Sequence, residues 1–179
     1  MFKNLSMKTK ILIIAVTGLF ILGSASLGIY VNDLSRAAVD AQVEKSRAIV
    51  LNVESVREEM QEKWDLGLFT VEMLQEFAAE NEFEKILATV PVFSAWNSAL
   101  KKADEGNYQF RVPKFQPRNP NNQPDEVEGR VIEQLKQEGL DELYLIDNEM
   151  NAVRYFRPVV LSETCLVCHG DPATSEELW

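Results

Sequence analysis

The sequence contains few of the residues from which catalytic and metal centres are usually built. Its 179 residues include one histidine and two cysteines. This scarcity excludes a Ser-His-Asp set and any peroxide chemistry that needs a second histidine, and it leaves no Cys or His beyond these three to complete a structural zinc site of four ligands. The paired acids Glu58 and Glu59 are most simply the solvated face of a helix. We therefore expect no enzymatic activity.

Positive charge is also scarce. The chain has 18 basic and 28 acidic residues, a formal net charge of −10. Three of the basic residues, Lys3, Lys8 and Lys10, precede the first acid, and the residues after them carry a net charge of about −13. Because an acidic surface repels a phosphate backbone, we expect no nucleic-acid partner.

Charged residues are absent from Ile11 to Val31, a run of 21 residues. A helix of this length spans a bilayer, and the lysines before it remain in the cytoplasm. We therefore expect a cytoplasmic N-terminus at 1–10, a transmembrane helix at 11–31 and an extracytoplasmic domain at 32–179. A cleaved signal peptide is the alternative, but 23–26 (Gly-Ser-Ala-Ser) is only a weak cleavage site and the apolar run is longer than the roughly 7–15 residues typical of signal peptides.

Both cysteines and the only histidine lie in the pentapeptide Cys165-Leu166-Val167-Cys168-His169. Cys-x-x-Cys-His is the attachment signature of c-type haem, in which the two thiols bond to the porphyrin and the histidine ligates the iron. A thioredoxin-like dithiol would need a βαβ framework, which the sequence lacks. We predict one covalent haem c per chain. This haem is attached outside the cytoplasm, so motif and span together place a single-pass protein in the bacterial inner membrane with its domain in the periplasm.

The sixth coordination position of the iron has no histidine or cysteine left to fill it. Methionine is the remaining familiar ligand, and Met60, Met73 and Met150 lie in the extracytoplasmic part. Met60 is the favoured candidate, since it lies on the apolar stripe of a long helix. Water or an open position is the alternative, and a flexible core filler is the more usual role of a helix methionine.

Other side chains are candidates for the haem surroundings. Arg154, Tyr155 and Arg157 precede the motif, and arginine suits the bidentate pairing that haem propionates offer. Alternate residues of a strand are exposed as a matter of course, so we expect one of the arginines to be merely solvated. Trp96 and Phe93 are interpreted as core residues first and as haem-pocket wall second.

Helical patterns dominate the first half of the domain. From Asp33 to about Glu80 there is no proline and only Gly67 among glycines, and apolar residues recur every three or four positions. This pattern predicts a long amphipathic helix continuing from the membrane, which Gly67 or the acidic stretch 80–82 bends or ends. Such a helix must pack on its own domain or on a partner helix, so we expect a homodimer. Residues 83–102 read as further helix interrupted at Pro91.

The second half predicts a small antiparallel sheet, and hence an α+β fold. Asp104 to Asn107 signal a turn. The expected elements after it are a strand at 108–112, a proline-rich loop at 113–124, a helix at 126–138 between Asp125 and Gly139, a hairpin of strands at 143–146 and 152–157, and a short helix capped by Ser162 that carries the haem motif.

Three stretches resemble one family: 108–113 (Tyr-Gln-Phe-Arg-Val-Pro) leading to 118–121 (Arg-Asn-Pro-Asn), 154–158 (Arg-Tyr-Phe-Arg-Pro) and 165–172 (Cys-Leu-Val-Cys-His-Gly-Asp-Pro). Together they are similar to the periplasmic c-type haem sensor domain of bacterial methyl-accepting chemotaxis proteins and related histidine kinases. The resemblance covers about residues 33–179. It implies a PAS-like sheet flanked by long helices, a tendency to dimerise, and a haem that responds to redox state or a small ligand.

The sequence departs from that family in two ways. One member group takes its sixth ligand from a cysteine on the long helix, and this sequence has none there. Such receptors also usually continue into a second membrane helix and cytoplasmic modules, so we expect this chain, which stops at Trp179, to be a fragment or to have lost its output module.

Two functions fit these features. The first is haem-based sensing of redox state or a small gaseous ligand, coupled to transmembrane signalling of the chemotaxis type. The alternative is a membrane-anchored monohaem cytochrome that exchanges electrons with a redox partner, guided by its acidic surface.

Overall fold

The computed structural model describes residues 6–117, 119–160, 165, 166 and 170. By its internal contacts the chain divides into two compact units, residues 1–44 and 45–179. The helix α1, Met7–Asp65, belongs to both units.

The first unit is the apolar part of α1. The large apolar side chains from Ile11 to Leu34 are exposed, with Phe20 at 75% and Leu19 at 72%. Within the described residues, this is the one helix long and apolar enough to serve as a single-pass membrane anchor. The expected continuation of the span into the domain as one helix is confirmed.

In the second unit, α1 ends earlier than the apolar pattern alone suggests. Gly67 adopts a left-handed conformation with φ of +73°, and the backbone N–H of Leu68 bonds to the carbonyl of Lys63. Glycine adopts this conformation without steric cost, which makes it a frequent helix terminator. The break at Gly67 is therefore confirmed, and the residues up to Ala79 form a separate helix, α2, Val71–Ala79, capped by Thr70.

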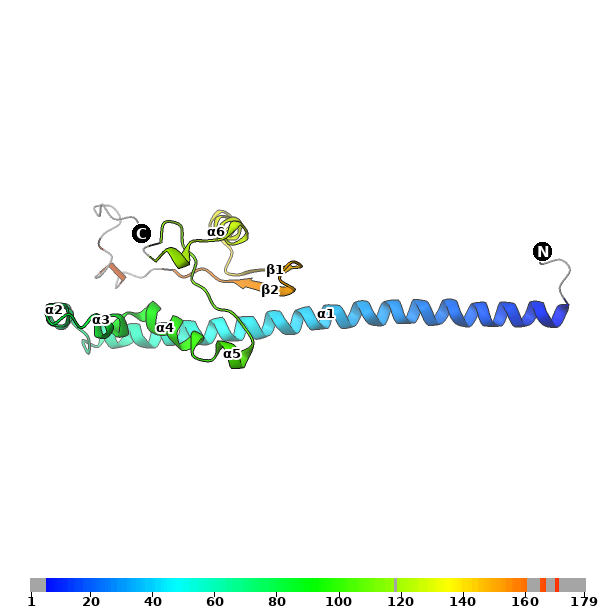
Figure 1. Ribbon diagram of the computed structural model, residues 1–179, viewed down its shortest axis with the longest axis horizontal. Helices are drawn as coiled ribbons and strands as arrows, with labels where there is room; N and C mark the ends of the chain where they lie inside the picture. The colour runs from blue at the N-terminus through cyan, green and yellow to red at the C-terminus, as the bar shows by residue number, and fades with distance from the viewer. Residues whose placement is uncertain (1–5, 118, 161–164, 167–169, 171–179) are drawn as a thin grey trace. The chain divides into compact units, whose positions relative to one another are not determined.

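Three short helices follow and pack along the C-terminal part of α1 (Figure 1). They are α3, Phe83–Thr89, α4, Pro91–Leu100, and α5, Ala103–Gly106. Pro91 stands in the first turn of α4, where a missing N–H costs nothing, so the predicted interruption at this residue is confirmed. The turn predicted at 104–107 is the end of α5, where Asn107 adopts the left-handed conformation.

A small core joins α4 to α1. Val53 packs with Ala95 and Ala99, and half-buried Ile49, Val56 and Phe110 surround them. Trp64 adds a second contact, because its indole N–H donates to the carbonyl of Thr89 over 2.8 Å.

The strand predicted at 108–112 is wrong, since these residues form no ladder in the part of the chain described. Side-chain hydrogen bonds hold this segment in place instead. The Tyr108 hydroxyl donates to the carbonyl of Ala99 over 2.7 Å, and Arg111 donates to the carbonyls of Asn121 and Gln123. Alternation of apolar and polar residues matches a strand, but here it reflects docking between α4 and the loop that contains the 3₁₀ turn η2, Pro120–Asn122.

The last described elements are α6, Glu126–Glu138, and a hairpin of β1, Leu143–Asp147, and β2, Ala152–Phe156. The predicted caps of α6 are confirmed, with a capping box at Asp125 and Gly139 in the left-handed conformation. The strands pair antiparallel with Leu145 opposite Arg154. This mostly helical unit with a two-stranded antiparallel sheet confirms the long helix and the small sheet, while a PAS-like arrangement stays a prediction.

Candidate functional site

The haem-attachment motif is described only in part. Cys165 is half-exposed, and the backbone N–H of Gly170 donates to the carbonyl of Leu166 over 2.7 Å. Cys168 and His169 lie outside the described residues, as does Ser162. The thioether and iron bonds expected of these side chains therefore stay predictions.

The strand β2 and Arg157, the residue that follows it, present the three other predicted site residues to two different surroundings. Side chains alternate along a strand, so Arg154 lies on one face and Tyr155 and Arg157 lie on the other. Arg154 contacts acidic residues at the start of α6 and in β1. Tyr155 and Arg157 instead contact acidic residues that either bond to α1 or belong to it. The structure thus separates residues that the sequence analysis grouped together.

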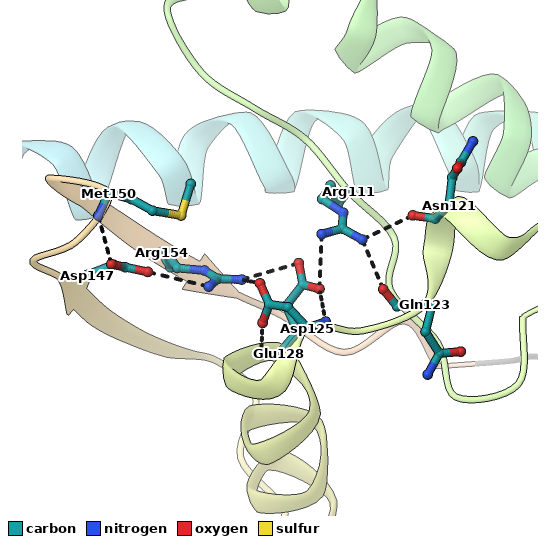
Figure 2. Close-up of polar contacts among 8 residues, drawn as sticks. All are labelled: Arg111, Asn121, Gln123, Asp125, Glu128, Asp147, Met150 and Arg154. Carbon is teal, nitrogen blue, oxygen red and sulfur yellow. Dashed lines mark hydrogen bonds and ion pairs between the residues drawn. The ribbon is translucent and has the colours of Figure 1, made fainter.

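Arg154 is the centre of a network that we call the α6 clasp, drawn in Figure 2. Its guanidinium lies 2.7 Å from Asp125, 3.3 Å from Glu128 and 3.5 Å from Asp147. Arg111 reaches the same Glu128 carboxylate at 3.2 Å. The Glu128 side chain is only 5% exposed. Two arginines therefore compensate three carboxylates, and the clasp fixes the hairpin to the start of α6.

The electrostatics of the clasp favour the charged forms of Arg154 and Asp125. Burial alone lowers the pKa of Arg154, but hydrogen bonding and attraction to Asp125, followed by Glu128 and Asp147, outweigh it and raise that pKa. Burial alone raises the pKa of Asp125, but the backbone N–H of Glu128 and the Arg154 guanidinium lower it overall. Sequence reasoning found the Asp125 cap. The spacing of Asp125 and Glu128 also carries the capping-box signal, while the roles of Arg111 and Asp147 depend on tertiary contacts.

On the other face of β2, the Tyr155 hydroxyl donates to Glu142, which also accepts two hydrogen bonds from Arg47 of α1. The Arg47 guanidinium lies 6.0 Å from the centre of the Tyr155 ring. The hydrogen bonds from Arg47 and then from Tyr155 lower the pKa of Glu142 to about 2. Burial, followed by the bond to Glu142, raises the pKa of Tyr155.

Arg157, just after β2, donates to Glu54 of α1 over 3.0 Å. Burial alone lowers the pKa of Arg157, but Glu54 outweighs it and raises that pKa. Arg47 and Glu54 are two helical turns apart and lie on one side of α1. We call these two contacts, Arg47 with Glu142 and Tyr155, and Glu54 with Arg157, the α1 links.

The candidate sixth ligands lie in different places. Met60 is half-buried, and the Lys63 ammonium lies 3.9 Å from its sulfur. Met60 shares a helix face with Val56 and Trp64, which contact the region of α3 and α4. Met73 is half-buried in α2, and Met150 is 56% exposed in the hairpin turn. Ligation by any of them stays a prediction.

Phe93 and Trp96, interpreted from sequence as core first, lie on α4. Their rings meet edge to face with centroids 6.1 Å apart, and Phe93 lines a groove of about 530 Å³ between α3 and α4. The indole Nε1 of Trp96 is buried and has no hydrogen-bond partner among the residues that the structure describes. Burying an unpaired N–H costs about 1–3 kcal/mol. The Cys-x-x-Cys-His donor set fits a domain that holds haem.

A comparison with protein-family models matches residues 35–179 to the Tll0287-like family. Searches of the curated proteins and of the solved structures found no match. The matched range agrees with the extent of the resemblance seen in the sequence, and the family is associated with c-type haem binding. The link to chemotaxis proteins or histidine kinases stays a prediction. The chain belongs to the Tll0287-like family, with the haem-associated domain following an apolar N-terminal helix.

Proposed function

We propose that this chain is a membrane-anchored periplasmic haem sensor in which the response passes from the attachment motif through β2 to α1. When bound, c-type haem supplies an iron that changes oxidation state and can accept a small ligand. Cys165, Cys168 and His169 would hold it. The observation that carries the proposal is that β2, the last described strand before the motif, and Arg157 just after it are joined to α1, the helix that contains the apolar span.

The path is short. Only residues 158–164 separate Arg157 from Cys165 along the chain. A displacement of the attachment segment therefore acts on Arg157 through a brief covalent connection, and Arg157 is bonded to Glu54 of α1.

The contacts on the two faces of β2 differ in how deeply they are buried. The α6 clasp buries Glu128 under two arginines, whereas the α1 links are about a third exposed, with 29% and 27% for Arg157 and Glu54. Ion pairs of such exposure contribute about 0.2–1 kcal/mol each, so they exchange partners easily. The clasp thus acts as the fixed side and the α1 links as the side that yields.

For a signal to pass, two states of the site must differ in interaction energy with two positions of α1. The test uses the full haem-loaded chain in lipid nanodiscs, with redox-stable gadolinium labels at Ser35→Cys and Gln137→Cys. Both positions are exposed, the first on α1 and the second on α6. We expect the label-to-label distance to differ between the ferric, ferrous and carbon-monoxide-bound protein.

Arg157→Gln should abolish this difference while leaving the absorption spectrum unchanged. Arg130→Gln is the matched control, because Arg130 pairs with Glu126 on the exposed side of α6 and should leave the difference intact. Identical distances in every haem state of the wild-type chain would overturn the sensing proposal.

The competing function is electron transfer by an anchored cytochrome, which the net charge of −10 favours by attracting a basic partner. It predicts unchanged distances together with fast electron exchange that slows as salt is added. Sensing predicts label distances that differ between haem states, without fast salt-sensitive electron exchange.

A further inference from the structure

We propose that the groove between α3 and α4 binds a basic amphipathic helix of another protein. An apolar side chain of that helix would enter the groove, and its lysines or arginines would meet the carboxylates beside it. The groove has a volume of about 530 Å³, which is within the range of about 300–1,000 Å³ typical of binding sites. Leu87 and Phe93 give it apolar walls, and Glu84 and Lys101 are the charged residues of its lining.

The two helices leave apolar surface exposed at the groove. α4 packs on α1 through Ala95 and Ala99, which are buried in a cluster with Val53, so its groove side is free of that contact. On α3, Leu87 is 42% exposed, and Phe83, one turn earlier on the same face, is 60% exposed. Two large apolar side chains one turn apart therefore form a strip that a partner can bury.

Acidic residues predominate in the helices around this strip. Residues 71–106, from α2 to α5, contain seven acids and three bases, a net charge of −4. Glu72, Glu76 and Glu80 are exposed and follow one another at intervals of four residues, so they lie on one face of α2 and its C-terminal cap. α2 packs against α3, whose exposed Glu84 lies in the groove.

These four carboxylates have no compensating base. In the part of the chain that the structure describes, none of them pairs with a lysine or arginine, and the nearby Lys85 pairs with Glu82 instead. Like charges four residues apart repel one another on a helix, and carboxylates at a helix C-terminus also oppose its dipole. α2 has no basic residue in its last turn. Basic side chains of a partner would relieve this repulsion.

Charge also selects between possible partners. A symmetric contact between two copies of the chain joins the same patch of each, so it would place one net charge of −4 against another. A basic partner meets the carboxylates with opposite charge, which favours both the encounter and the bound state. An amphipathic helix suits the site, because its apolar side chains recur every three or four residues and are the usual anchors in grooves between helices.

The experiment measures binding of a synthetic helical peptide of lysine and leucine, with leucines every three or four positions, to the full haem-loaded chain in phosphatidylcholine nanodiscs. Isothermal titration calorimetry gives the affinity, and empty nanodiscs give the blank. We expect saturable binding that weakens as salt is added. Leu87→Gln should weaken it about three- to tenfold, and Glu84→Gln about two- to fivefold.

Each variant has a matched control. Leu51→Gln changes a leucine of α1 that is also 42% exposed, and Glu133→Gln changes an exposed carboxylate of α6, so both should leave the affinity unchanged. Equal losses in Leu87→Gln and Leu51→Gln overturn the proposal. Heat no larger than that of the empty nanodiscs also overturns it, as does equal binding of a peptide with glutamate in place of lysine.

A second copy as the true occupant would show itself in the oligomeric state. If Leu87→Gln dissociates a dimer of the chain in analytical ultracentrifugation, the groove is a self-contact and the proposal is wrong. The inference goes beyond haem-based sensing and does not rest on it. Label distances that stay constant between haem states therefore leave it standing, and a failure of the peptide to bind leaves the sensing proposal standing.

Discussion

Removal of Arg154 should destabilise the domain far more than removal of an exposed arginine from the same region. In Arg154→Ala, Glu128, with a side chain 5% exposed, keeps Arg111 at 3.2 Å but loses its second counter-charge. Asp147, 13% exposed, loses the Arg154 contact as well. Removing one partner of a fully buried ion pair costs about 3–5 kcal/mol. Because Arg111 remains, we expect a loss of about 2–3 kcal/mol in the free energy of unfolding.

The assay is urea unfolding of the haem-loaded chain followed by circular dichroism. Arg130→Ala is the matched control. Its partner, Glu126, is exposed and lies four residues earlier on α6, so we expect a loss of about 0.5 kcal/mol or less. Adding Glu128→Gln to Arg154→Ala should recover part of the loss, because it removes the buried charge that the first change leaves undercompensated. Equal destabilisation by Arg154→Ala and Arg130→Ala would refute the reasoning, as would a double variant no more stable than Arg154→Ala.

Three further predictions concern other parts of the domain. The pKa of Glu142 is lowered from 4.5 to about 2, so its interactions stabilise the fold above pH 4.5 and are lost as the pH falls towards 2. Since the pair with Arg47 is about a third exposed, Glu142→Gln should remove only about 1 kcal/mol of this acid-sensitive stability. Unfolding of both proteins at pH 7 and pH 3 measures the difference. Gly129→Ala places a Cβ at an ordinary 3.6 Å from the Phe115 ring and should stabilise α6 by about 0.5–1 kcal/mol. Gly139→Ala changes a residue at φ of +63° and should destabilise α6 by about 1 kcal/mol. Thermal melts that rank the two variants the other way contradict the helix assignment. Met60→Ala should turn a low-spin ferrous spectrum high-spin if its sulfur is the sixth ligand, and an unchanged absorption spectrum rejects that role.

Local signals predicted much of the secondary structure correctly. The end of α1 at Gly67, the start of α4 at Pro91 and the two caps of α6 each depend on one residue whose backbone preference does not require distant partners. The hairpin is similar, because Asp147 accepts hydrogen bonds from the backbone N–H groups of Glu149 and Met150 within its own turn.

The error at 108–112 has the opposite origin. A strand exists only if another strand pairs with it, and alternation of apolar and polar residues cannot supply that partner. Here Tyr108 and Arg111 bond to the backbone of α4 and of the following loop instead. The same limit applies to Arg154, because its charge suggests an anion as partner but does not select among the acids of the chain.

By itself, the sequence determined the chemistry that this protein can carry: an apolar helix of membrane length, a Cys-x-x-Cys-His motif for covalent haem, and no histidine or cysteine outside that motif. These features follow from residue type and spacing along the chain. Only the tertiary structure decided which partner each charged or polar side chain has. It committed Arg154 to three carboxylates, joined Arg157 to Glu54 of α1, and left the buried N–H of Trp96 without a partner among the described residues. The physical reason is that hydrogen bonds and ion pairs depend on distances of a few ångströms, which packing sets between residues far apart in the sequence.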